Sequence, residues 1–564
     1  MNTYEPRVKA TLSDLERRQV AVKVWAKDPG LWKSEADHQA IIRRSLGWLT
    51  VAEMMSEQSE SIGGFATEVT QAGFSDVLLL GMGGSSLCPD VLRLTFGAVP
   101  GFPPLHVLDT TDPASILAAE QSLDLARTFV IVSSKSGTTP EIAALHQYFF
   151  TKVRELKGTY AGNQFVAITD PGTPLEALAR AQSFRRTFLN PPDIGGRYSA
   201  LSYFGLVPAA LIGVDVSKLL DRAERMAHSC VSCVPSDENP GLWLGAILGA
   251  MALSGRDKVT FVTSPEISAF GSWVEQLIAE STGKDGKGIL PVDGEGLAIP
   301  ERYGNDRLFV YLRLDGTRDE RPDVQVKALE QAGHPTVTLR LRDLYDLGGE
   351  FFRWEFATAV AGAVMGVNPF DQPNVQESKD NTKQLLDEYK VTRALPEGEP
   401  ILSDGEVRLY GDGNAAAAVE GRRNLSAALN AHLSRVKPGD YVALTAYLER
   451  SPSTEKALGE IRRSIRDRFK VATTLGFGPR FLHSTGQLHK GGGDNGLFLQ
   501  FTAEDRVDLP IPGEPYSFGV MKRAQALGDL RSLEKRERRA LRIHIVGDLE
   551  AGLERVHHAI TMMG

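Results

Sequence analysis

The stretch Val77-Leu78-Leu79-Leu80-Gly81-Met82-Gly83-Gly84-Ser85-Ser86 decides the fold, because a short apolar run passes directly into a glycine-rich turn. A second stretch has the same layout. There the apolar run 129–132 leads into Ser133-Ser134-Lys135-Ser136-Gly137-Thr138-Thr139-Pro140-Glu141. Amphipathic sequence follows each turn, which is typical of strand-to-helix units in a parallel sheet covered on both faces. These stretches predict an α/β fold.

The same alternation extends outward in two cycles. Bounded apolar runs of strand length occur at 77–80, 105–108, 129–132 and 165–168, and again at 259–262, 289–292, 308–312 and 336–339. Since helical sequence separates the runs, we expect two tandem doubly wound parallel-sheet domains.

The remaining sequence predicts a division into four parts. Residues 1–65 are expected to be a helical segment, 66–225 the first sheet domain and 226–393 the second, which contains a long helical pattern from 349 to about 389. After a linker at 394–405, residues 394–564 are expected to form a C-terminal α/β domain. Its predicted strands lie at 441–447, 497–501 and 541–546, and its predicted helices at 454–469 and 519–536.

Composition limits the partners. The 564 residues carry 71 acidic and 63 basic side chains, mixed along the chain, so we expect no nucleic-acid partner. No apolar run approaches the roughly 20 residues of a membrane span, and the N-terminus lacks the features of a secretory signal. With only three cysteines, a reducing cytoplasm is the expected location. We expect no metal or cofactor.

The two glycine and hydroxyl turns predict a site for one phosphate monoester. Gly83 and Gly84 allow the backbone to approach an anion, and helix N-termini supply N–H donors. The predicted phosphate ligands are Gly83, Gly84, Ser85, Ser134, Ser136, Thr138 and Thr139, with Lys135 nearby. The turn does not match the dinucleotide-binding motif G-x-G-x-x-G, because Ser86 occupies the position of the third glycine. It is not a P-loop either, because no G-K-[ST] follows the glycines.

This pair of turns resembles the sugar isomerase (SIS) domain, which binds phosphosugars and has a flavodoxin-like fold. Three further segments resemble signatures of the phosphoglucose isomerase family. They are Ile194-Gly195-Gly196-Arg197-Tyr198-Ser199, Ala279-Glu280-Ser281-Thr282-Gly283-Lys284 and Asn368-Pro369-Phe370-Asp371-Gln372-Pro373-Asn374-Val375-Gln376-Glu377-Ser378-Lys379.

The resemblance implies catalytic roles that fit the chemistry. Aldose–ketose exchange moves a proton between neighbouring carbons through a cis-enediol, and Glu280 is the expected base. Arg197 would stabilise the enediolate charge. Lys379 would assist ring opening, with Gln372 contacting substrate near it. Glu275, on the opposite face of the same predicted helix, is expected to face solvent.

The ring-opening histidine departs from the family's order. Leu482-His483-Ser484-Thr485-Gly486-Gln487 resembles the family's L-H-S-x-G-Q segment, but it follows the F-D-Q segment instead of preceding it. In ordinary members a neighbouring subunit supplies this histidine, which implies a homodimer; here His483 could act within its own chain. A second departure is Asn374, where the family has Gly or Ala. The arrangement most resembles the isomerase half of bifunctional transaldolase/phosphoglucose isomerases.

These features predict a phosphoglucose isomerase that interconverts glucose 6-phosphate and fructose 6-phosphate. Two alternatives stay open: an isomerase that also accepts mannose 6-phosphate, and a non-catalytic phosphosugar sensor. A sensor would need the binding turns but not Glu280, Arg197 and the His483 segment.

Overall fold

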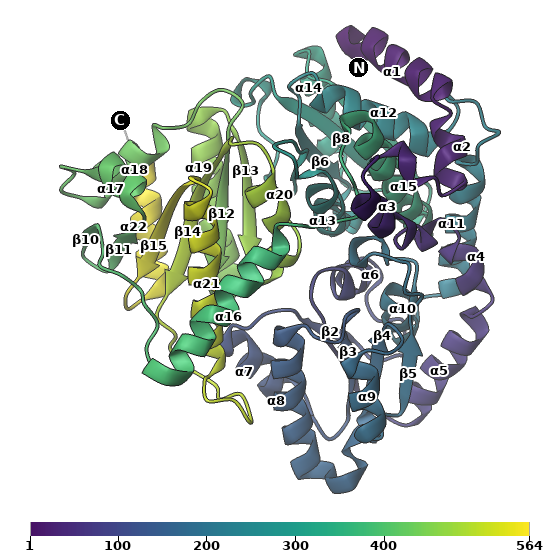
Figure 1. Cartoon of the computed structure of the whole chain (residues 1–564), viewed down its shortest axis with the longest axis horizontal. Coiled ribbons are helices and arrows are strands. Elements are labelled where there is room, and N and C mark those ends of the chain that lie inside the picture. Colours follow the sequence, from purple (N-terminus) through teal and green to yellow (C-terminus); the bar gives the residue numbers. More distant parts are fainter. Residues whose placement is uncertain (1, 563–564) are drawn as a thin grey trace.

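A computed structural model describes residues 2–562, whose strands form three separate sheets (Figure 1). The first sheet has the order β2-β1-β3-β4-β5, with every pairing parallel. Its strands are β1 (Asp76–Leu80), β2 (Leu105–Leu108), β3 (Thr128–Ser133), β4 (Phe165–Thr169) and β5 (Arg186–Leu189). β3 and β4 are buried along their whole length, as expected of central strands covered on both faces.

Helices connect these strands and bury their apolar sides on the sheet. They are α6 (Leu87–Phe96), α7 (Pro113–Ser122), α8 (Pro140–Lys157) and α9 (Pro174–Ala181), followed by α10 (Tyr203–Leu211) and α11 (Val216–Ser229). α7, α8 and α9 each have proline in the first turn, where a missing N–H costs nothing.

The second sheet is parallel, with the order β7-β6-β8-β9. Its strands are β6 (Lys258–Thr263), β7 (Leu290–Val292), β8 (Arg307–Leu314) and β9 (Thr336–Leu341). Its helices are α12 (Pro240–Ala252), α13 (Phe270–Thr282), α14 (Arg321–Gln331) and α15 (Leu347–Met365). The predicted two tandem doubly wound sheets are thus confirmed.

The third sheet is mixed, with the order β10-β11-β15-β14-β12-β13. Its strands are β10 (Leu402–Asp404), β11 (Val407–Tyr410), β12 (Tyr441–Tyr447), β13 (Ala472–Phe477), β14 (Gly496–Ala503) and β15 (Arg539–Ile545). β12 to β15 are parallel, whereas β10 and β11 run antiparallel at one edge. In chain order the four parallel strands repeat the arrangement 2-1-3-4 seen in both preceding sheets.

The helices of the third unit complete its doubly wound layout. They are α17 (Gly413–Val419), α18 (Leu425–Leu433), α19 (Pro452–Phe469), α20 (Gly486–Gly491), α21 (Phe518–Lys535) and α22 (Leu549–Thr561). The apolar periodicity of the sequence correctly predicted β12, β14, β15, α19 and α21. It did not predict β10, β11 and β13 of this sheet or β5 of the first sheet. β5 lies at a sheet edge, and only Phe188 of its four residues is buried, so it carries little apolar signal.

The long helical pattern predicted over 349–389 consists of two helices with a loop between them. α15 ends at Met365, Gly366 adopts a left-handed conformation with φ +71°, and a new helix, α16 (Val375–Thr392), starts after the 368–374 loop. Gly366 ends the helix because only glycine adopts this conformation without strain. α16 leaves the second unit and packs along α21 of the third.

The N-terminal helices flank the first two units. They are α1 (Glu5–Arg17), α2 (Val20–Trp25), α3 (Ala36–Arg43), α4 (Val51–Ser56) and α5 (Ser59–Gln71). α1 contacts α12, α4 contacts α11 and α5 contacts α10 (Figure 1). The exact division of the chain at 65, 225 and 393 stays a prediction. None of the helices described over residues 2–562 is long and apolar enough to cross a bilayer.

A buried ion pair joins the second unit to the third. Nη2 of Arg307 lies 3.0 Å from Oε1 of Glu295 and donates to the Val471 carbonyl at 3.1 Å. The same Oε1 accepts hydrogen bonds from the backbone N–H and the hydroxyl of Thr473, both at 2.8 Å. Burial by itself would raise the pKa of Glu295. The positive charges of Arg307 and Arg462 have the larger effect, so the pKa of Glu295 lies below its usual value.

Arg307→Met should therefore lower the free energy of unfolding by about 3–5 kcal/mol, because it leaves the Glu295 carboxylate buried without its partner. The double variant Arg307→Met/Glu295→Met should lose clearly less. Urea unfolding followed by tryptophan fluorescence measures both. Because the folded pKa of Glu295 is depressed, its contribution is present above the unfolded pKa and is lost as pH falls. A double variant as unstable as the single would contradict the buried-charge explanation.

Candidate active site

The glycine turn after β1 brings distant loops together. Gly83 has a φ of +55°, and a Cβ added there would lie 3.0 Å from the His483 Cβ. A Cβ added at Gly84 would lie 1.9 Å from the Gly196 carbonyl oxygen. Both positions therefore need glycine, and through them the turn touches the loops that carry Arg197 and His483.

The hydroxyl turn after β3 forms a cup at the start of α8. The Ser134 and Thr139 hydroxyls lie 3.0 Å apart, and the Thr138 hydroxyl donates to Ser136 at 3.0 Å. Ser134 is buried, whereas Ser136 and Thr138 are exposed. The first N–H groups of a helix have no intrahelical acceptor, so those of α8 add donors to this cup.

Lys135 lies between two residues of the hydroxyl cup but has partners of its own. Its ammonium forms an ion pair with Asp170 and donates to the Pro192 carbonyl at 3.2 Å. It is thus engaged at the carboxyl end of β4, because Asp170 supplies a carboxylate there, and the hydroxyls rather than Lys135 define the cup.

Arg197 is the centre of the buried site, and its side chain is 3% exposed. Nη1 lies 3.5 Å from the Glu280 carboxylate and donates to the Gln372 side chain at 3.1 Å. The other nitrogens donate to the Ser281 hydroxyl at 2.7 Å and to the carbonyls of Pro369 (2.7 Å) and Asp371 (2.9 Å). One guanidinium thus joins all three signature segments.

Glu280 lies near the end of α13 and is 8% exposed. One carboxylate oxygen faces Arg197, and the other accepts a hydrogen bond from Nε2 of Gln276 at 3.1 Å. The same Gln276 nitrogen donates to the His483 carbonyl at 2.7 Å. The carboxylate is therefore held on both sides, and its position is tied to the His483 loop. Sequence reasoning missed Gln276, although it lies one helical turn before Glu280.

Lys284 and Asp371 form a second buried element that sequence reasoning missed. Lys284 Nζ contacts Asp371 Oδ1 at 2.7 Å and its carbonyl at 2.5 Å. Burial first, and then Arg197, lower the pKa of Lys284 to about 8. Asp371 Oδ2 is also 3.1 Å from both Asn368 and the His38 ring of α3. This pair fixes the loop whose carbonyls bind Arg197. The lysine of the E-S-x-G-K segment was the available sequence signal.

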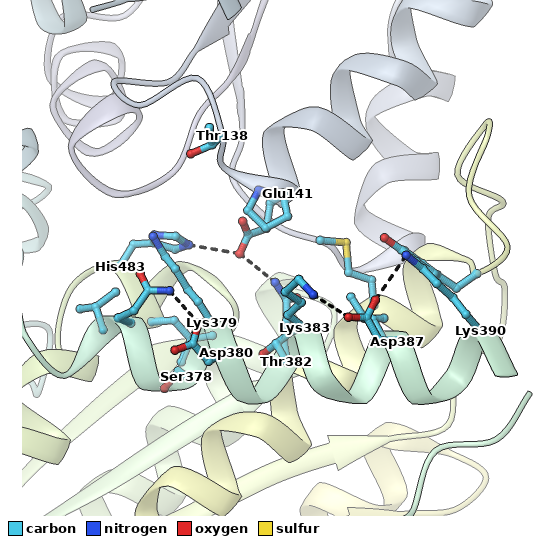
Figure 2. Close-up of a pocket in the computed structure, with 18 residues that line it drawn as sticks. Thr138, Glu141, Ser378, Lys379, Asp380, Thr382, Lys383, Asp387, Lys390 and His483 are labelled. Carbon is cyan, nitrogen blue, oxygen red and sulfur yellow. Dashed lines mark hydrogen bonds and ion pairs between the residues drawn. The ribbon is translucent and has the colours of Figure 1, made fainter. Parts of the chain in front are cut away.

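His483 sits at the edge of the site, in a short 3₁₀ turn after β13. Its Nε2 lies 3.2 Å from Oε1 of Glu141, the first-turn acid of α8, and Gln525 Nε2 donates to the same oxygen at 2.8 Å (Figure 2). Burial raises the pKa of Glu141, but His483, a backbone hydrogen bond and Lys379 together hold it below its usual value. An ionised Glu141 can thus orient the imidazole.

Lys379 and Gln372 complete the predicted set. Lys379, on α16, lines a cavity of about 400 Å³ together with Thr138, Glu141 and His483 (Figure 2). Gln372 is exposed and reaches Arg197. Lys379 and His483 thus line one cavity with Thr138 of the hydroxyl cup, while Gln372 lies with Arg197 and Glu280.

Glu275 does not face open solvent as predicted. It is half-buried and lines a separate cavity of about 290 Å³ with Asp293, Arg462 and Arg480. Burial first, and then the Asp293 carboxylate, raise the pKa of Glu275 to about 8. The third unit covers this helix face, which sequence periodicity could not show.

Comparisons with known proteins agree on one family. The phosphoglucose isomerase family model matches residues 41–291. The chain is 32% identical to a glucose-6-phosphate isomerase of Rubrobacter xylanophilus over 365 residues, covering 56% of this chain and 83% of the relative. It is 27% identical to that of Trichormus variabilis over 448 residues, covering 70% and 81%. Among solved structures, a glucose-6-phosphate isomerase of Chlamydia trachomatis shares the fold, with TM-score 0.59, 20% identity and 68% and 86% coverage.

Gly84→Ala tests the close approach between the turns. The new methyl would collide with the Gly196 backbone, so we expect a loss of about 1–3 kcal/mol and a melting temperature several degrees lower. Gly64→Ala is the control, because a Cβ there meets nothing within 4 Å and α5 gains helix propensity. Equal melting temperatures for the two variants would contradict the packing described.

Proposed function

This chain belongs to the phosphoglucose isomerase family, and we propose that its buried site interconverts glucose 6-phosphate and fructose 6-phosphate. The observation that carries the proposal is the Arg197–Glu280 pair, 3.5 Å apart and nearly excluded from solvent. Gln276 and His483 link this pair to Glu141 in the first turn of α8, where the hydroxyl cup lies. A carboxylate base and a fixed cation together provide what an enediol intermediate needs.

The phosphate binds at the hydroxyl cup. Ser134, Ser136, Thr138 and Thr139 offer hydroxyl donors, and the α8 N-terminus offers backbone N–H groups. Gly83, Gly84 and Ser85 form the facing wall, where glycine allows the sugar to lie close to the backbone. Binding the phosphate there would direct the sugar carbons toward Glu280.

Glu280 transfers the proton. It removes a proton from C2 of the open-chain aldose, or from C1 of the ketose, and returns it to the neighbouring carbon of the cis-enediol. One carboxylate serves both steps because the two carbons are adjacent. Arg197 stabilises the enediolate oxygen, and since Ser281, Gln372 and two carbonyls already hold its guanidinium, little reorganisation accompanies charge development. Such a donor contributes about 3–4 kcal/mol to transition-state stabilisation.

Ring opening precedes that step. His483, oriented by Glu141, exchanges a proton with the sugar ring oxygen, and Lys379, which lines the same cavity, stabilises charge there. The carboxylate fixes which ring nitrogen faces the sugar, as in other acid-oriented imidazoles.

Other expectations accompany this proposal. Turnover of mannose 6-phosphate, a homodimer, a cytoplasmic location and the absence of a nucleic-acid partner stay predictions. A non-catalytic sensor would have no use for the Arg197–Glu280 arrangement, and the first experiment below separates the two.

Glu280→Gln should reduce conversion of fructose 6-phosphate to glucose 6-phosphate by roughly 10²-fold or more, because an amide cannot accept the proton. Wild-type turnover is expected to persist in EDTA. Glu275→Gln is a matched control on the same helix. Its carboxyl has a pKa of about 8 and is mostly protonated at pH 7, so an amide replaces it with little change. A wild-type protein that binds fructose 6-phosphate without turnover would favour the sensor.

His483→Gln should lose roughly 10²-fold in turnover of fructose 6-phosphate but less than about 10-fold with 5-deoxyfructose 6-phosphate. The analogue lacks the hydroxyl that closes the furanose ring, so no ring-opening acid is needed. Coupled assays and NMR measure the two reactions. Glu280→Gln should lose activity with both sugars, and equal losses of His483→Gln on both would contradict the assigned role.

A further inference from the structure

The chain order of the signature segments raises the question of which subunit supplies His483. The resemblance to ordinary family members implies delivery by a neighbouring subunit, whereas three observations in this chain indicate otherwise. They concern the contacts of the His483 loop, the connection that leads to it and the attachment of the unit that carries it.

The His483 loop closes the site made by the same chain's other two units. Its ring reaches Glu141 of the first unit at 3.2 Å, and its carbonyl accepts from Gln276 of the second at 2.7 Å. Because Gly83 has no side chain, it leaves room for the Cβ and the backbone carbonyl of His483. Contacts therefore run from His483 to the cup and to Glu280, without a second chain.

The connection from the second unit to the third is short and fixed at both ends. Loop 368–374 is bound by Arg197 and Lys284 on one side. On the other, the Asn374 N–H donates to Gln487 at 2.9 Å, and Gln487 donates back to Asn374 at 2.7 Å. α16 begins at the next residue and packs on α21. Exchange of the third unit between chains would need a hinge, and this connection has no slack for one.

Buried charges attach the third unit to the first. Lys522 of α21 is 4% exposed and lies 2.7 Å from Asp112, which is 2% exposed; it also contacts Asp505. Arg480 lies 3.3 Å from Asp90 and 3.1 Å from Asp109. Gln525 accepts from Thr111 at 2.7 Å while donating to Glu141. Separating the units would leave Asp112 without Lys522 and Arg480 without its carboxylates, which is strongly unfavourable.

Apolar packing attaches the third unit to the second. One buried cluster contains Ala279, Leu290 and Val292 of the second unit together with residues of the third, among them Tyr441, Phe498 and Leu530. Ala279 precedes the proposed base directly, so this contact supports the site itself.

We infer that each chain assembles its complete isomerase site in cis, with the third unit acting as a permanently docked arm that delivers His483 to Glu280 of the same chain. This inference rests on the proposed function. It makes activity independent of any subunit contact, whichever oligomer the protein forms.

Subunit mixing tests the inference. Chains carrying Glu280→Gln and chains carrying His483→Gln are co-expressed with different affinity tags, and the hybrid is purified through both tags. If the site is formed in cis, every site in the hybrid carries one substitution, and turnover should stay below about a hundredth of wild type. Delivery in trans would create one intact site per hybrid dimer, and recovery of about half the wild-type turnover would overturn the inference.

Two controls keep the outcome clear. If no hybrid forms because the chain is monomeric, sedimentation of wild type at assay concentration should show that the active species is the single chain, which supports the inference. Activity that appears only in a dimer, and falls with dilution, would count against it. Wild type and both parental variants are assayed in parallel, so a wild type without isomerase activity would contradict the proposed function instead.

Discussion

The Arg197 guanidinium is the interaction on which the site depends. Five groups from two other segments meet at its nitrogens: the carboxylate of Glu280, the side chains of Ser281 and Gln372, and the carbonyls of Pro369 and Asp371. Since a guanidinium is planar and permanently charged, it fixes the directions of these groups as well as their distances. Lys284 and Asp371 then hold the loop that holds Arg197, so the positive charge is set before substrate arrives.

Three sheets with the same order of parallel strands surround this centre. In such sheets the turns at the carboxyl ends of the strands bind ligands. The first unit contributes the glycine turn and the hydroxyl cup there, and the third contributes the His483 loop after β13. The second contributes Glu280 at the far end of α13. A change in the chain order of the segments is tolerated because catalysis requires only that the groups meet in space.

Buried ion pairs lie where the three units meet. Arg307 with Glu295 joins the second unit to the third, and Lys522 with Asp112 joins the third to the first. Such pairs add little net stability compared with apolar contacts. A displaced third unit would remove Val471 and Thr473 from the Arg307–Glu295 pair and would leave Asp112 without Lys522. The pairs therefore favour one docking geometry, which is what a site shared among three units needs.

The sequence by itself determined the α/β class and the two tandem sheets and supplied the proposed site residues, because apolar periodicity and short polar signatures are local properties. Glu280, Arg197, His483, Lys379 and the hydroxyl turn could each be chosen from their neighbours in the chain. Gly366 and the prolines of the 368–374 loop are local signals of the break between α15 and α16, but local sequence could not show that α16 packs on the third unit. It also could not show that Lys135 turns toward Asp170, that Gln276 links Glu280 to His483, or that the third unit covers Glu275. Those facts depend on pairings between residues far apart in the chain, and only the packing of the three units decides them.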